Sequence, residues 1–250
     1  MLNEKITTNL EKVLYLNEYL DKHLNINNLK QNFAKQVIYK IVFENLLRYK
    51  NNFSIWNNQI DTQKFENYLR QIADFIYENI YLSKIIEKKD ILKLHYLIMK
   101  NLPLEKIVNL GVLRKSEMKI HWNNTAGKLI TTFPTKPKYI EQEFNLQINN
   151  LNSNLLKWDK KDKLLSIIIF IHNIIDIIHP FENGNWKVFR ILLDVLLFKI
   201  DFFPLFILKK EHREKLFNKV IAHYLDNKKK EVFLNYFLEL MIDIYWNYKM

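Results

Sequence analysis

The sequence predicts an all-α protein with one short β-hairpin. Apolar residues recur at helical spacing along most of the 250 residues, as Leu10, Val13 and Leu20 do near the N-terminus. The stretch from 104 to 137 departs from this pattern, because two of the three glycines and two of the five prolines fall within it. A hydrophobic content of 48% is enough for one sizeable core.

The predicted helices follow from apolar periodicity and from the polar or proline-containing breaks between them. Asp61 and Asp90 are predicted N-caps, and residues 49–58 are a predicted Lys/Asn-rich loop. Two β-prone runs, 118–122 and 128–133, flank an Asn- and Gly-containing turn and predict the hairpin. The helices are expected at 2–24, 29–49, 62–80, 91–101, 139–156, 161–178, 186–200, 211–226 and 231–248.

Composition excludes some classes of protein. The chain has no cysteine, so disulfide and thiol chemistry are excluded. The most apolar window, 164–178, contains Asp176 and is shorter than the roughly 20 residues of a membrane span, which favours a buried helix. The first thirty residues carry no apolar signal region. We therefore expect a soluble cytoplasmic protein, or one delivered into a host cell, with no membrane partner.

The most informative stretch runs from 178 to 190, between two long apolar runs. Pro180 and Gly184 predict a tight loop between two helices, and this loop carries His179. Lys187 and Arg190 lie three residues apart, on one face of the second helix. A helix N-terminus favours a bound phosphate. The sequence thus predicts a proton acceptor beside a phosphate site. Because glycine is rare, each of the three is expected where other residues fit poorly.

This stretch resembles the motif of the Fic family, in which a histidine is followed by Pro-Phe, an acidic position, Gly-Asn-Gly-Arg and a second Arg. The resemblance covers about 91–248 and implies a Fic-like helical bundle around a helix–loop–helix motif. It implies a Fic-like domain at 86–250, with a flap at 117–134 and the motif at 179–190, after a helical extension at 1–85. The matching positions are His179, Pro180, Phe181, Gly184, Asn185 and Arg190, with further similarity at His95, Gly111, Arg114, His172, Phe203 and Pro204.

The resemblance also implies a function. Most family members move AMP from ATP to a Ser, Thr or Tyr hydroxyl of a target protein. His179 would be the general base, and Gly184 and Asn185 would form the anion nest. Arg190 would bind the terminal phosphate, with Trp186 and Lys187 in the same nucleotide site. The flap would dock the target by strand addition, through Met118, Ile120, Lys128 and Ile130.

Three positions depart from the family motif. Asn183 replaces the acidic ligand of Mg²⁺, and a neutral carbonyl is a weaker ligand for a hard cation. Trp186 replaces a glycine at the mouth of the phosphate site, either to stack on a base or to block the site. Lys187 replaces an arginine and lacks its bidentate fork. Use of Mg²⁺ is therefore in question, and no dedicated metal site is indicated.

A regulatory residue is also predicted. Many relatives carry a helix whose glutamate pairs with the second motif arginine, and the Glu44-Asn45 pair resembles the end of that pattern. Glu44 is thus a candidate inhibitory partner of Arg190, with an ordinary surface glutamate as the alternative. His95 and His172 are expected to be packed, hydrogen-bonded helix histidines.

Several functions stay open at this point. The first is AMP transfer to a protein hydroxyl. The second is a catalytically inactive protein that binds a nucleotide or a partner protein. The third is transfer from another donor, or AMP removal with Glu44 positioning water. The fourth, nucleic-acid binding through the net charge of +11, is weaker because the lysines are spread along the chain. A homo-oligomer is compatible with each.

Overall fold

The structure of the chain, a computed structural model, describes residues 4–47, 62–100, 109–157, 159–205, 220, 222, 224 and 229–249. These residues form helices and one two-stranded antiparallel hairpin, so the predicted all-α class is confirmed. The helices are α1 (Glu4–Leu24), α2 (Ile26–Leu46), α4 (Thr62–Ile76), α5 (Lys88–Met99), α6 (Pro137–Leu155), α7 (Lys160–His172), α8 (Asn185–Lys199) and α10 (Lys230–Lys249). The π-helices η3 (Tyr77–Tyr81) and η4 (Asn173–Ile178) continue α4 and α7, and the strands are β1 (Ile120–Asn123) and β2 (Leu129–Thr132).

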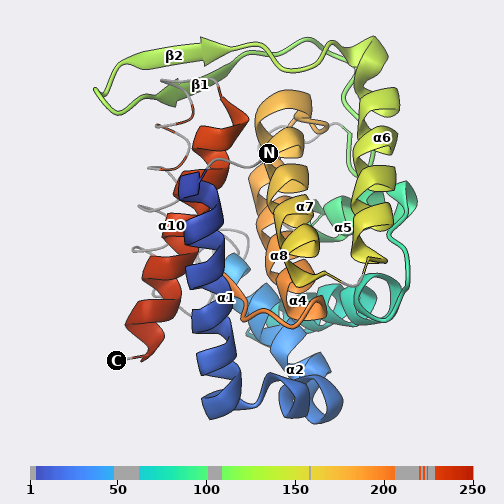
Figure 1. Cartoon of the computed structure of the whole chain (residues 1–250). Coiled ribbons are helices and arrows are strands. Elements are labelled where there is room, and N and C mark those ends of the chain that lie inside the picture. The colour runs from blue at the N-terminus through green and yellow to red at the C-terminus, as the bar shows by residue number, and fades with distance from the viewer. Residues whose placement is uncertain are drawn as a thin grey trace.

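Helix α8 occupies the centre of the bundle (Figure 1). Every residue from Val188 to Phe198 is buried. A helix that is apolar all round must be covered on every side. Helices α2, α5 and α7 pack against it, while α1 and α10 pack on each other at one flank. The hairpin lies across one end of the bundle, so α8 begins beneath it (Figure 1).

The N-terminal helices share this core. Asn45 on α2 donates from Nδ2 to Oδ2 of the buried Asp194 on α8, at 3.0 Å. The other carboxylate oxygen of Asp194 accepts from the Leu205 backbone N–H at 2.7 Å. On the far flank, Asn9 of α1 donates to Asn235 of α10 at 3.0 Å. The boundary at residues 85 and 86 stays a prediction, although α2 is anchored directly to α8.

Several predicted helix ends differ from the observed ones. The break expected at 25–28 is a single residue, because Asn25 takes a left-handed conformation and caps α2 by accepting from the Asn28 N–H. Asp90 is not the N-cap of α5. Glu87 is, and Asp90 accepts from its N–H at 3.0 Å in a capping box.

Two predicted segments are not covered by the structure. The loop at 49–58 and most of the helix at 211–226 lie outside the described residues. Among the helices that are described, none is long and apolar enough to cross a membrane.

The hairpin has one face toward the helices. Trp122 pairs with Ile130 and Ile120 with Thr132, and these four side chains are half-buried. The alternate residues, such as His121 and Thr131, are exposed. Two of the four flap residues expected to dock a target, Ile120 and Ile130, therefore point toward the bundle. Of the other two, Met118 is half-buried and Lys128 is exposed.

Candidate active site

The histidine loop begins where the α-helical hydrogen-bond pattern of α7 widens into the π-helix η4. The N–H of His179 donates to the Ile174 carbonyl, five residues back, at 2.8 Å. His179 itself takes a left-handed conformation, with φ 49° and ψ 66°. Such a conformation is uncommon for a residue with a Cβ, and both it and π-helical turns concentrate at functional sites. The chain therefore turns sharply at the predicted base.

The ring of His179 is held in one tautomer. Its Nδ1 lies 2.9 Å from the Ile175 carbonyl, so Nδ1–H donates and Nε2 carries the lone pair. Burial lowers the pKa of His179 below its usual 6.5, with a smaller lowering from the charge of Arg114, while the hydrogen bond to Ile175 acts in the opposite direction. The side chain is therefore a neutral imidazole at pH 7, as a general base must be.

Helix α8 is capped at its N-terminus by Gly184, which has φ 82° and lies next to Met99 of α5. A Cβ built on Gly184 would lie 2.5 Å from the Met99 sulfur. Two requirements therefore exclude other residues here: a left-handed backbone and a close side chain. Gly127 at the hairpin turn has a similar φ of 74°, but no atom lies within 4 Å of its Cβ position.

These two glycines make a matched pair of variants. Gly184→Ala is expected to lower the free energy of unfolding by about 2–4 kcal/mol, because overpacking adds to the backbone strain. Gly127→Ala should cost only the strain, about 1 kcal/mol. Urea denaturation of both variants measures the difference, and equal losses would contradict the contact with Met99.

The side chain of Asn185 holds the histidine loop together. Its side chain is buried, donates to the Phe181 carbonyl at 2.7 Å and accepts from the Phe181 N–H at 3.0 Å. The amide therefore closes the loop on itself, and what it can offer a phosphate is its backbone N–H in the first turn of α8. The phosphate nest at Gly184 and Asn185 would therefore be formed by backbone N–H groups alone, and it stays a prediction.

His95 on α5 holds the same loop from the other side. Its Nε2–H donates to the Asn183 carbonyl at 3.0 Å, and its Nδ1 accepts from the Gly111 N–H at 2.9 Å. Its ring stacks on Phe181, with centroids 3.9 Å apart. Burial lowers the pKa of His95 to about 4. This packed, hydrogen-bonded histidine is the one the sequence predicted.

Arg114 ties the flap to the loop. The buried guanidinium donates to carbonyls at both ends of the hairpin, Ser116 and Thr135, and to the loop carbonyls of Ile178 and His179. Its backbone N–H donates to Pro180 at 2.8 Å. The sequence placed Arg114 before the flap but assigned it no role. The sequence signal that could have pointed to this role is the spacing of three residues between Gly111 and Arg114.

Trp186 is covered by the flap. Its ring meets Trp122 of β1 edge-on, with centroids 5.9 Å apart and planes at 78°. Trp186 is half-buried and packs against the core. The blocking role that the sequence left open for Trp186 therefore has a structural basis, since its ring contacts the hairpin through Trp122.

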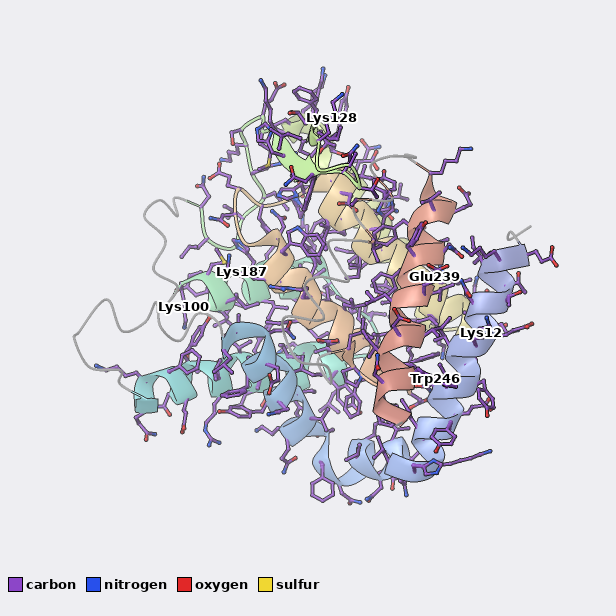
Figure 2. All side chains as sticks on the ribbon, turned by 90° about the vertical axis from the view of Figure 1, so that its left-hand side faces the viewer. Lys12, Lys100, Lys128, Lys187, Glu239 and Trp246 are labelled. Carbon is purple, nitrogen blue, oxygen red and sulfur yellow. The ribbon has the colours of Figure 1, made fainter. Side chains whose placement is uncertain are left out.

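The two cations of α8 lie on neighbouring turns. Arg190 is buried, and its Nε donates to the Trp186 carbonyl at 3.3 Å. Lys187 is half-buried, and its charge contributes to the lowered pKa of His95. Figure 2 shows Lys187 on α8, with Lys128 on the hairpin above it. Both cations thus lie within the first turns after the loop.

The donor set does not fit a resident Mg²⁺. The Oδ1 of Asn183, at the position of the family's metal ligand, accepts from the Gly184 N–H at 2.7 Å. The adjacent Glu182 is exposed, and its oxygens accept from Asn109 and Ser116. No group of three metal-binding side chains occurs among the residues the structure describes. Binding of Mg²⁺ at this loop therefore stays a prediction.

Glu44 does not contact Arg190. Its carboxylate lies 2.7 Å from Lys40 Nζ, one turn earlier on α2. The neighbouring Asn45 is the residue that reaches α8, through Asp194. An inhibitory role for Glu44 stays a prediction, and it requires a change of partner.

Comparison with known proteins places this site in a family. The Fic/DOC family model matches residues 85–197, from the turn before α5 to the last turn of α8. This match, over a little less than half of the chain, and the solved structures below show that the chain has the Fic fold. A comparison with curated protein sequences finds no match.

Three solved structures share the fold at low sequence identity. A Fic family protein from Desulfovibrio desulfuricans G20 has a TM-score of 0.65 and 13% identity, over 100% of this chain and 75% of that one. A fragment of Fic-1 from C. elegans has a TM-score of 0.60 and 15% identity, over 97% and 71%. A Fic domain containing signaling protein from Bacteroides thetaiotaomicron VPI-5482 has a TM-score of 0.55 and 12% identity, over 95% of each chain.

Proposed function

We propose that the protein is a nucleotidyltransferase that moves AMP from ATP to a Ser, Thr or Tyr hydroxyl of a target protein. The observation that carries the proposal is the ring of His179, whose Nδ1 is bonded to Ile175 so that the neutral Nε2 is left as a base. The target oxygen attacks the α-phosphorus, and its proton passes to Nε2. The bond from the α-phosphorus to the bridging oxygen breaks, and pyrophosphate leaves.

The surroundings of His179 support an anionic donor. Helix α8 begins six residues later, and its N-terminus adds a partial positive charge to those of Lys187 and Arg190. Fixed positive groups stabilise the charge that develops on transferring phosphoryl oxygens. Target docking is proposed on the hairpin, which Arg114 fastens to the histidine loop at both ends.

A second candidate is an inactive Fic-fold protein that binds a nucleotide or a partner protein. The edge-on contact between Trp122 and Trp186 favours it, because the two indoles lie over the start of α8. Asn183 favours it as well, because its carbonyl oxygen is already bonded to Gly184.

Label transfer distinguishes the two candidates. The wild-type protein, incubated with ATP labelled at the α-phosphate and with candidate targets, is expected to label a target or itself. Asn183→Asp combined with Trp186→Gly should raise the rate about tenfold or more, equivalent to about 1.4 kcal/mol of transition-state stabilisation. Label that appears only in the double variant identifies the natural protein as inactive. Folded protein without label in either form would contradict the proposal.

A further inference from the structure

A hollow lies between the hairpin and η4, close to the histidine loop. It has a volume of about 500 Å³, in the size range of small-ligand pockets. Strand β2 and the segment up to Thr135 form one wall, and η4 forms another through Asp176 and Ile177. Trp122 and Tyr224 complete the lining. The transfer step proposed above uses none of its polar groups.

The hollow contains a buried carboxylate. The side chain of Asp176 is only 5% exposed. Its Oδ2 accepts from His172 Nδ1 at 2.9 Å, and a neutral imidazole suffices for this bond. Across the described residues, the basic side chain that pairs with Asp176 is His172, and no lysine or arginine forms an ion pair with it. A carboxylate in such a place is costly unless a cation or further donors reach it.

The rest of the lining suits a cation as well. The Oγ1 of Thr132 is buried without a hydrogen-bond partner in the described part of the chain. Trp122, Phe133 and Tyr224 provide aromatic walls, and rings of this kind attract ammonium and guanidinium groups. Phe133 already shows this behaviour, since Lys119 Nζ lies 5.8 Å from its ring centroid.

We propose that this hollow is a binding site for an organic cation with N–H donors, a guanidinium or ammonium group, held by Asp176 and Thr132 between the aromatic walls. The cation donates to Asp176 Oδ1 and to Thr132 Oγ1. Its source is either a basic side chain of a segment docked on β2 or a small free cation. The site does not depend on AMP transfer.

Binding of paired neutral and charged probes tests the site. The probes are N-acetyl-arginine amide and its neutral isostere N-acetyl-citrulline amide, titrated into the full chain. The readout is the indole N–H signal of Trp122 in a nitrogen–proton NMR spectrum, assigned with Trp122→Phe. The arginine probe is expected to bind at least tenfold more tightly than the citrulline probe. Equal affinity for the two probes would overturn this proposal, and it would leave the proposal of AMP transfer unaffected.

Variants locate the binding group. Asp176→Asn keeps an acceptor for His172 but removes the charge, and it should weaken the arginine probe about tenfold. Asp162→Asn, at an exposed carboxylate of α7 paired with Lys157, should leave binding unchanged. An unchanged affinity in Asp176→Asn overturns the proposal.

A third probe identifies the source of the cation. It is an extended heptapeptide with one serine and one arginine. If it binds tenfold more tightly than the amide, the cation belongs to a docked chain. Equal affinity assigns the site to a free small cation.

Discussion

Replacing His179 by alanine is expected to lower nucleotidyl transfer by about 10²- to 10⁴-fold, the usual contribution of a general base. The loss follows from the proposed role of Nε2, the ring nitrogen left to accept the hydroxyl proton because Nδ1 is bonded to Ile175. Removing the ring also removes that bond to Ile175, so thermal unfolding of the variant must be measured alongside. The assay is initial-rate incorporation of label from ATP.

His23→Ala is the matched control for this variant. His23 is exposed on α1, where Nδ1 contacts the Tyr19 carbonyl, and its loss should leave the rate unchanged. A His179→Ala variant that folds and retains the wild-type rate would exclude His179 as the base.

The pH profile of transfer by the wild-type protein gives an independent test of the same role. A base is active when deprotonated, and the pKa of His179 is lowered, so the rate should stay constant as the pH falls from 8 to about 6.5. It should decline only below that pH, as the imidazole becomes protonated. A decline that begins above pH 7 would point to another group.

Replacing Arg114 by methionine is expected to lower the free energy of unfolding by about 3–5 kcal/mol, the usual result of breaking a buried polar network. The guanidinium satisfies four backbone carbonyls from two separate segments, and methionine satisfies none of them. Arg114→Lys should recover only part of the loss, because an ammonium lacks the planar fork that reaches both sides.

Urea denaturation and amide exchange measure this effect. The Thr135 N–H, which donates to Ile177 at 2.8 Å, should exchange faster in both variants, because the end of the flap is no longer fastened. Arg70→Met is the control: Arg70 is exposed on α4 against the Tyr39 ring, and its loss should cost less than about 1 kcal/mol. If Arg114→Met costs no more than Arg70→Met, Arg114 does not hold the flap.

The helices, the hairpin and the special glycine positions could be predicted from the sequence because each depends on local residue preferences. Helical periodicity placed α1, α6, α8 and α10 to within a few residues, and the β-prone runs around Gly127 placed the hairpin. The scarcity of glycine was equally informative, because Gly111, Gly127 and Gly184 all have positive φ. Each of these features depends on a residue and its near neighbours in sequence.

The sequence did not specify which neighbouring group each polar side chain of the site would contact. Asn185 stays a candidate for the phosphate nest through its backbone N–H, while its side-chain amide bonds the Phe181 backbone, four residues earlier. Glu44 was a candidate partner of Arg190, with an ordinary surface glutamate as the alternative. It pairs with Lys40 in the structure, and the contact with α8 comes from Asn45. Both contacts depend on side-chain direction, which periodicity does not encode.

The sequence alone determined the helical class and the hairpin, and it identified His179 as the candidate base and Lys187 and Arg190 as the two cations that follow it. A motif specifies residue types at fixed spacing. Within one helix or tight loop, this spacing largely fixes which residues lie next to each other. Tertiary structure alone decided the tautomer of His179, the fastening of the flap by Arg114 and the cover of Trp186 by Trp122. It also created the hollow at Asp176, because β2 and η4 come together only when the chain folds.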